Sequence, residues 1–420
     1  MRIILLFLFL CLIGCTSEVS PNLTAGASST SINPPMGSFI AGADRNRKFN
    51  EVKDSLFVKA VVLNDGQSSV AIVTVDCIGL LYPEIRKIQE LASQGSSVPA
   101  DRIIVSSTHT HAGPDVVGIW GPDLMTTGRD SAYLSFLVNS AAEQIIKADQ
   151  KRVPVELFGS EGAYLSDWYS NICMEEIDRS VSVISLQSKS GASIATLTNF
   201  ACHPTFLDTH FSVVSSDYPG AFYKAMDQKH GGVNLFLQGA IGGWVQPDDK
   251  LFRELGESND QPAAFALAER YGKDLADSVT AMLAKSKKIQ DASIRYQKLD
   301  FRFPVENPNW RLLSQAGVIH RTFTDSVQTT ISWFSIGSAQ FITHPGETTP
   351  WLGLKSKELM KSGPRFVLGL SQDALGYILK PEFFTDSTRL HSGYLTSMSL
   401  GSQTTPILLE KIKLVMSEGF

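Results

Sequence analysis

Short apolar runs of strand length recur along the chain and alternate with longer segments of helical periodicity, and this alternation predicts an α/β fold. The turn made by Asn64, Asp65 and Gly66 joins the first two runs and indicates a β-hairpin. Because the composition shows no break between residues 34 and 420, we expect one domain there, with a mixed β-sheet core flanked by helices. Strands are expected at residues 57–63, 69–75, 102–107, 181–186, 193–200, 233–238, 338–343 and 366–370, and helices at residues 82–93, 133–147 and 262–285.

Polar clusters follow several of these expected strands. His109 and His111 come after the third strand, His203 after the fifth and Glu347 after the seventh. If the extended backbone continues, side chains two residues apart leave on the same face, so His109 and His111 are expected to point into one space. Sites in helix-covered sheets form in the loops beyond strand ends, so we expect His109, His203 and Glu347 around one cleft. Taken singly, each of them is typical of a structural or surface residue.

The composition excludes some classes of protein. Hydrophobic residues make up 43% of the chain and charged residues 19%, which is the balance of a globular protein rather than a disordered one. The formal net charge is −5, and the chain has no run of Lys or Arg. We therefore expect no nucleic-acid partner.

The N-terminus has the pattern of an export signal. The apolar run at residues 3–13 is too short to cross a bilayer permanently but suits the core of a signal peptide. The sequence Leu12-Ile13-Gly14-Cys15 resembles a bacterial lipobox, so residues 1–14 are expected to be removed and Cys15 to carry a lipid. Residues 15–33 are rich in small polar residues and are expected to form a flexible tether. The protein would then be exported and anchored in the bacterial cell envelope; a plain secretory signal is the alternative.

Three cysteines lie beyond this N-terminal region: Cys77, Cys173 and Cys202. Their odd number and the lack of a Cys-x-x-Cys spacing argue against a disulfide framework or a cysteine-rich metal site. Cys77 follows an apolar run, so a buried free thiol is expected there. One disulfide among the three stays open, since an exported protein meets an oxidising compartment.

The order of the polar motifs resembles that of the neutral ceramidases. The most specific stretch is the His-x-His-x-Gly-Pro motif at residues 109–114, and a strand-end His-Pro, a Pro-Gly-Glu and a Gly-Tyr follow it in order. The resemblance implies the α/β catalytic domain of that family, without its C-terminal β-sandwich domain. The matching segments are residues 35–37, 56–63, 75–76, 107–114, 199–204, 216–220, 238–242, 345–347, 369–371, 376–377, 381–382 and 393–394.

The resemblance also implies a zinc-dependent amidase. Zinc binds nitrogen and oxygen ligands, and at a catalytic site it activates a water molecule for attack on a carbonyl. The resemblance assigns His111 and Tyr394 to the scissile amide, where they would stabilise the oxyanion and protonate the leaving amine. Four residues correspond to the zinc ligands of the family: His109, His203, Glu347 and Tyr377.

Two departures from the family bear on the substrate. The family's Asn-Arg pair is Asn171-Ile172 here, and its Gly-Asp after a glycine-rich strand end is Gly242-Gly243. The metal ligands survive these changes, whereas recognition of ceramide depends on groups that differ. The expected substrate is therefore N-acylsphingosine or a related lipid amide, which a membrane anchor would keep near the enzyme. The alternatives are a small amide or ester on a sugar or peptide, and a ligand-binding lipoprotein without catalysis.

Overall fold

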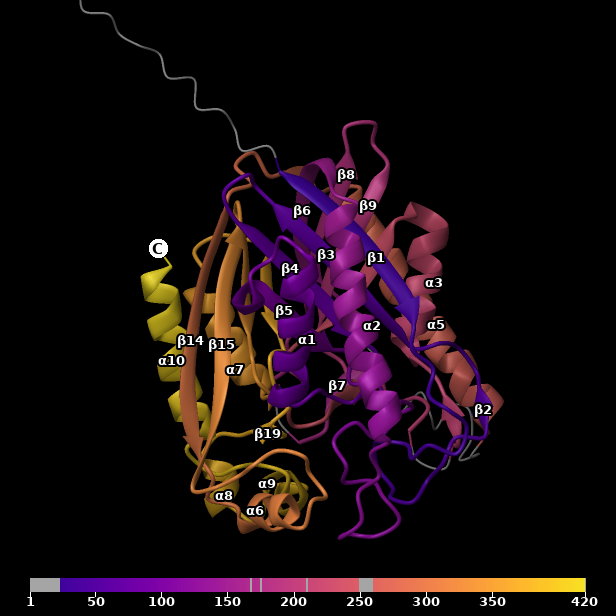
Figure 1. Ribbon diagram of the computed structural model, residues 1–420, viewed down its shortest axis with the longest axis vertical. Coiled ribbons are helices and arrows are strands. Elements are labelled where there is room, and N and C mark those ends of the chain that lie inside the picture. Colours follow the sequence, from indigo (N-terminus) through magenta and orange to yellow (C-terminus); the bar gives the residue numbers. More distant parts are fainter. Residues whose placement is uncertain (1–22, 167, 174–175, 209–210, 249–259, 420) are drawn as a thin grey trace, which may run out of the picture.

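The computed structural model describes residues 23–166, 168–173, 176–208, 211–248 and 260–419. In this part of the chain, two β-sheets pack face to face, and helices cover the outer face of each sheet (Figure 1). The expected mixed sheet core with flanking helices is thus confirmed, and it is divided into four layers.

The large sheet has the strand order β11-β9-β8-β6-β1-β3-β4-β5, and β13 pairs with β6. The β3–β4 pair forms the expected hairpin, while β4 and β5 run parallel. The two strands at the other end, β9 and β11, are also parallel. The bounds are β1 (Thr24–Ser31), β3 (Phe57–Asn64), β4 (Ser69–Val75), β5 (Ile103–Ser107), β6 (Val153–Ala163), β8 (Ser180–Ser188), β9 (Ser193–Phe200), β11 (Val233–Gln238) and β13 (Lys287–Lys288).

The smaller sheet has the order β14-β15-β16-β18, and three two-stranded pairs, β10-β2, β12-β7 and β17-β19, lie outside both sheets. The bounds of the small sheet are β14 (Ile294–Pro304), β15 (Ser326–Ile336), β16 (Ala339–Thr343) and β18 (Arg365–Leu368). Those of the short strands are β2 (Glu51–Val52), β7 (Tyr169–Asn171), β10 (Val213–Val214), β12 (Val245–Pro247), β17 (Glu347–Thr348) and β19 (Tyr377–Ile378).

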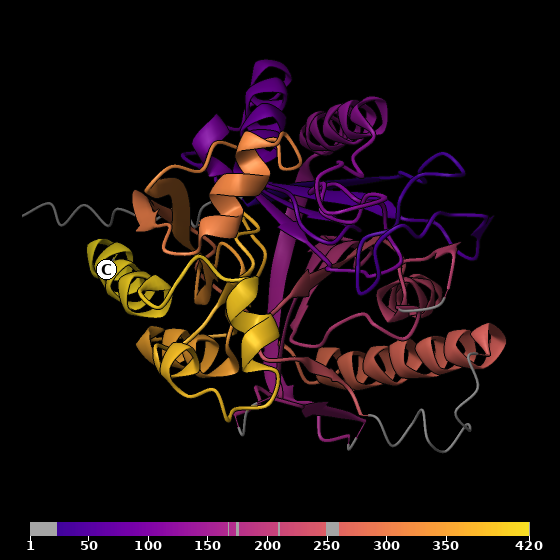
Figure 2. The same cartoon turned by 90° about the horizontal axis from the view of Figure 1, so that it is seen from below.

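Helices α1, α2, α3 and α5 cover the large sheet, and α7 and α10 cover the small one (Figures 1 and 2). At the start of α2, the Asp130 carboxylate accepts hydrogen bonds from two backbone N–H groups, which caps the helix. None of the helices in the described ranges is both long and apolar enough to span a bilayer. The bounds are α1 (Tyr82–Gly95), η1 (Ala100–Arg102), α2 (Ser131–Gln150), α3 (Tyr218–His230), α5 (Gln261–Leu283), α6 (Pro308–Gln315), α7 (Pro350–Leu359), α8 (Glu382–Thr385), α9 (Ser392–Ser397) and α10 (Thr404–Glu418).

Apolar side chains from both sheets fill the space between them. Val61 and Ile72 of the large sheet belong to one buried cluster with Phe334, Phe341 and Phe366 of the small sheet. The three phenylalanine rings stack in a row, with successive centroids 4.5 and 4.3 Å apart. These side chains are fully buried, so their contact holds the two sheets, and the strand ends that carry the polar loops, in a fixed relation.

The expected tether at residues 15–33 is wrong from Thr24 onward. Residues 24–31 form β1, which pairs along its full length with β3 and at its start with β6, in the middle of the large sheet. Its small polar residues are there because α2 crosses closely above it: a Cβ on Gly26 would lie 2.1 Å from the Ala148 carbonyl oxygen. Ser28 also donates to Gln144 of this helix. The expected signal peptide and the lipid site Cys15 lie outside the described residues.

The N-terminal residues and the polar loops lie at opposite ends of the strands of the large sheet. Thr24 at the start of β1 is level with Asn64, which is paired in turn with Ser69 at the start of β4. The loops that follow β4 and β5 begin at the opposite ends of these strands. The first described residues therefore lie a full strand length from the polar loops after these strands (Figure 1).

The three cysteines of the folded part, Cys77, Cys173 and Cys202, are free thiols, so the disulfide that the sequence left open is not formed. Cys77 and Cys202 are fully buried, and burial raises the pKa of Cys77 to about 12. Both are therefore packing residues.

Candidate metal centre and active site

Three strand-end loops bring His109, His203 and Glu347 together. His109 follows β5, His203 follows β9, and Glu347 opens the short strand β17 after β16. All three side chains are buried, with exposed fractions of 4%, 2% and 8%. The sequence-based expectation that these loops surround one site is confirmed by their geometry.

The backbone at His109 differs from the expected extended continuation. His109 has φ of +70°, in the left-handed region, so the chain turns directly after β5. Two backbone hydrogen bonds hold this turn, from His109 to Cys77 and from His111 to Pro204. The rings of His109 and His111 still share one space, with centroids 4.9 Å apart. Strain of this kind persists where the surrounding structure fixes it, as it does in many functional sites.

Hydrogen bonds to the backbone orient the two buried imidazoles. Nδ1 of His109 lies 2.5 Å from the Ile78 carbonyl oxygen, and Nδ1 of His203 lies 2.7 Å from that of Val245. A carbonyl oxygen can only accept, so both Nδ1 atoms carry a proton and both Nε2 atoms present a lone pair. Glu347 Oε2 lies 3.4 Å from Nε2 of His109 and 3.2 Å from Nε2 of His203.

Three electron-pair donors thus face one another at short range, and this arrangement fits a shared cation. Ligands in a tetrahedral zinc site, about 2.1 Å from the metal, lie about 3.4 Å from each other. Burial lowers the pKa of His203, which favours its neutral, ligating form.

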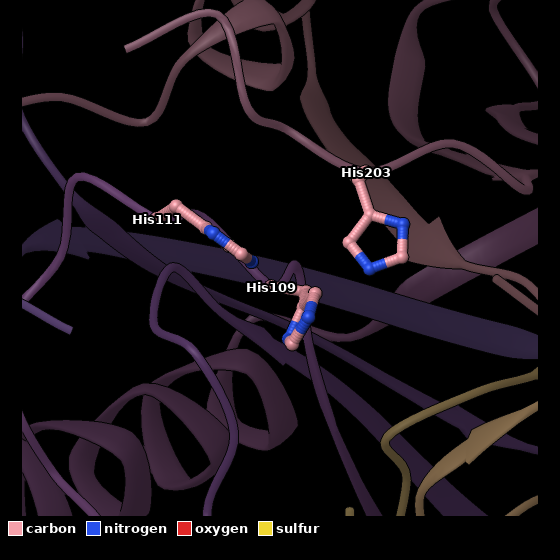
Figure 3. A group of neighbouring side chains, drawn as sticks. All are labelled: His109, His111 and His203. Atoms are coloured by element: carbon pink, nitrogen blue, oxygen red, sulfur yellow. The ribbon is translucent and has the colours of Figure 1, made fainter. Parts of the chain in front are cut away.

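His111 stands beside this set with a free nitrogen. The candidate ligand atoms of His109, His111 and His203 all lie within 4.8 Å of one another (Figure 3). Nδ1 of His111 lies 2.8 Å from Asp208 Oδ2, whereas its Nε2 is buried and has no hydrogen-bond partner among the described residues. Burial alone would raise the pKa of Asp208, but His111 and Arg47 lower it to about 2, so the carboxylate is charged at neutral pH.

Both tyrosines assigned from the sequence reach the same site. Tyr377 on β19 is paired with Glu347 on β17, and its hydroxyl accepts a hydrogen bond of 3.0 Å from Trp244 Nε1. Tyr394 on α9 is 46% exposed, and its ring lies 6.2 Å from that of Tyr377. Burial, with the charges of Glu347 and Asp208, raises the pKa of Tyr394 to about 12, so its hydroxyl keeps its proton at neutral pH.

A pocket connects these groups to solvent. His109, His111, Glu347, Tyr377 and Tyr394 form its polar part. The rest of its wall is largely apolar and comes from Ile78, Val117, Ile119, Trp310, Leu370 and Met398, among others. The pocket therefore joins a metal-binding donor set to a surface that suits a hydrocarbon group.

Asp208 and Trp244 are site residues that the sequence did not indicate. Asp208 follows no strand directly and belongs to none of the matched motifs. Trp244 lies just after the glycine-rich strand end, which the sequence did mark, and has φ of +64°. Ile172, which the sequence resemblance aligns with an Arg, donates its backbone N–H to the Trp244 carbonyl, so it adjoins the Tyr377 side of the site.

Comparison with known proteins supports the fold. No protein-family model matches the sequence. Among solved structures, the neutral ceramidase from Pseudomonas aeruginosa has a TM-score of 0.75 and 15% sequence identity, with 94% of this chain and 75% of that chain covered. A ceramidase complexed with C2 gives the same TM-score and coverage at 14% identity. At this level of identity the likeness concerns the fold, and the chain therefore has the neutral ceramidase fold over nearly its whole length.

Proposed function

We propose that this protein is a zinc-dependent hydrolase that cleaves an N-acyl amide bond in N-acylsphingosine or a related lipid amide. The observation that carries the proposal is that Glu347 Oε2 lies within 3.4 Å of Nε2 of both His109 and His203, and that His109 and Glu347 line a largely apolar pocket. Tyr377, next to Glu347, is the proposed fourth ligand, although its hydroxyl is bonded to Trp244 in this state.

Some residues of the site would bind the metal, and others would act on the substrate. A zinc ion bound by His109, His203, Glu347 and Tyr377 would lower the pKa of a bound water molecule and polarise the amide carbonyl. His111, through its unpartnered Nε2, would take a proton from the attacking water and deliver one to the leaving amine. Tyr394, protonated at neutral pH, would donate a hydrogen bond to the oxygen that gains charge.

The apolar wall supports a lipid substrate. Its side chains would remove an acyl chain from water, at about 0.8 kcal/mol per buried methylene group. One solved structure of this fold is a ceramidase complexed with C2, and we carry the ceramide class of substrate, which the name ceramidase gives, over to this chain. Attachment to a membrane through Cys15 is part of the same proposal and rests on the lipobox-like sequence alone.

The test is metal content together with hydrolysis of a fluorogenic N-acylsphingosine by the same protein preparation. We expect about one zinc per chain, loss of turnover with a chelator, and recovery when zinc is restored. Zinc without turnover would move the search to other amides and esters. A protein that binds no zinc would overturn the catalytic proposal and favour a ligand-binding lipoprotein.

A small amide or ester on a sugar or peptide is the second candidate substrate. The observation in its favour is Ile172, which puts an apolar side chain where the family has an Arg. The two candidates separate on one series of N-acyl substrates. For a lipid amidase, kcat/KM rises with acyl length, whereas for the second candidate it is highest with acetyl.

A further inference from the structure

We infer that Asp208 is a positioning residue for His111, which sets the tautomer and direction of this ring so that the lone pair of Nε2 faces the pocket. The inference deepens the proposed function and rests on it for the reaction concerned. It concerns a residue outside every motif that the sequence indicated.

The contact between the two side chains is direct and directional. Nδ1 of His111 lies 2.8 Å from Asp208 Oδ2. A charged carboxylate can only accept hydrogen bonds, so the proton of the neutral imidazole must lie on Nδ1. Nε2 is then the unprotonated nitrogen, and it is the atom that is buried without a partner on the pocket side.

Asp208 is itself held by a second set of groups. Its Oδ1 accepts a hydrogen bond of 3.0 Å from the backbone N–H of Ala43, and Arg47 Nη2 lies 3.5 Å from the same oxygen. Arg47 is fixed in turn by a hydrogen bond of 2.9 Å from Nη1 to the Phe211 carbonyl oxygen. The two carboxylate oxygens therefore have separate partners: Oδ1 contacts Ala43 and Arg47, and Oδ2 contacts His111.

The backbone near Asp208 is adapted to this approach. Gly42 has φ of +131°, and a Cβ at this position would lie 2.7 Å from Asp208 Oδ1 and 3.1 Å from the Cβ of His111. A residue with a side chain here would push the carboxylate away from the Ala43 N–H. The loop that carries Gly42 thus leaves room for the aspartate between Arg47 and the imidazole.

The decisive variant is Asp208→Asn, which is nearly isosteric. The Ala43 N–H fixes which way the new amide lies, because its oxygen must face that donor at the former Oδ1 position. The NH₂ group then faces Nδ1 of His111 and donates to it. The proton of the imidazole must move to Nε2, so the variant inverts the tautomer while it keeps the shape of the site.

Two readouts test the inference. In ¹⁵N-histidine spectra of the metal-free protein, with the His111 signals assigned by their loss in His111→Ala, we expect protonated Nδ1 in the wild type and protonated Nε2 in Asp208→Asn. In the zinc-loaded enzyme, we expect Asp208→Asn to lower kcat by about 10- to 100-fold with KM changed by less than about threefold and zinc content unchanged. In a His111→Ala background, Asp208→Asn should cause no further loss of kcat.

The matched control is Asp178→Asn, which removes another buried carboxylate charge, one paired with Lys357 at 2.7 Å and outside the pocket. We expect this control to lower the melting temperature but to leave kcat within about twofold.

If Asp208→Asn does not fold, the tautomer of His111 in the wild type still tests the inference. Protonated Nε2 in the wild type, or wild-type kcat in Asp208→Asn, would overturn the inference. A wild type that hydrolyses no amide sinks the proposed function, whereas the spectra still test the role of Asp208.

Discussion

The backbone carbonyl groups of Ile78 and Val245 orient two of the histidine rings in the site. Each carbonyl oxygen accepts a hydrogen bond from the Nδ1–H of a histidine, of His109 and His203 respectively, and this turns Nε2 of the ring toward Glu347. In water an imidazole would exchange between its tautomers, but here the backbone selects one of them before any metal arrives. Ligands arranged in this way lose little freedom when the ion binds, which favours affinity.

The division between metal ligands and reacting groups can be tested with two alanine variants. His203→Ala removes one of three converging donors and leaves Glu347 with one fewer partner, so we expect loss of bound zinc and of turnover together. His111→Ala should keep about one zinc per chain and lose about 100-fold or more in kcat. Metal analysis of both purified proteins decides this; loss of zinc in His111→Ala would make that residue a ligand.

His344 gives the metal-free protein a specific dependence of stability on pH. Both ring nitrogens are bonded to hydroxyl groups, of Thr348 and Ser356, and burial lowers the pKa of His344 from 6.5 to about 3. Between these values the unfolded chain binds a proton that the folded chain does not. The stability that this residue contributes is therefore complete above about pH 6.5 and is lost as the pH falls toward 3, on the order of 4–5 kcal/mol.

Between pH 6.5 and 4, we expect the free energy of unfolding of the wild type to fall more steeply with decreasing pH than that of His344→Gln. The difference in slope corresponds to nearly one additional proton bound on unfolding. Urea denaturation of the metal-free proteins measures both slopes, since metal release in acid then plays no part. The slopes are compared rather than the absolute stabilities, because the substitution in a buried site has its own cost. Equal slopes would contradict the shifted pKa.

At the scale of elements, the contact of α5 with α3 depends on a residue that lowers helix propensity. A Cβ on Gly272 would lie 2.3 Å from the Tyr218 carbonyl oxygen and 2.7 Å from the Cβ of Ala221. In an isolated helix, replacing Gly by Ala stabilises by about 1 kcal/mol. Here the backbone oxygen of α3 cannot yield, so we expect Gly272→Ala to lower the free energy of unfolding by about 1–2 kcal/mol.

Gly393→Ala is the control, because it adds a methyl group in helix α9 where, among the described residues, no atom outside the adjacent residues and the helix backbone lies within 4 Å. We expect it to leave stability unchanged or to raise it by at most about 1 kcal/mol. Thermal or chemical unfolding of both variants makes the comparison. A Gly272→Ala protein at least as stable as the wild type would show that the two helices can separate without loss.

Prediction from sequence succeeds for some elements and fails for others for a physical reason. Strands β9 and β11 pair in parallel, and most of their residues are buried and are apolar or β-branched, so their bounds are predicted to the residue. Strand β14 was not predicted, because Lys298, Asp300 and Arg302 alternate along it at the edge of the small sheet. Charged residues on an edge strand prevent pairing with other chains and also conceal the strand in the sequence.

The same contrast holds within the site. His109, His203 and Glu347 were found because each follows a strand and because their order along the chain matches a family. Asp208 has no such signal, since its meeting with His111 depends on how two loops approach each other. Turn geometry was also hidden, and the left-handed backbone of His109 could not be foreseen from a residue that rarely adopts it.

At the scale of the whole molecule, the place of β1 predicts how much of the N-terminus the fold needs. A chain that begins at Leu23 should unfold cooperatively at the wild-type temperature, because every described strand remains. A chain that begins at Ile32 lacks β1, which separates β6 from β3 in the large sheet. We expect it to lose the cooperative transition. Calorimetry of both proteins checks this, and a well-folded shorter chain would show that β1 is dispensable.

The opposite positions of Thr24 and of the loops that follow β4 and β5 have a practical consequence. A protein fixed to a bead or sensor surface at Leu23 presents the loops that follow β4 and β5, which contribute to the pocket, to the flowing solution rather than to the support (Figure 1). Immobilised in this way, it would meet dissolved or micellar substrates freely.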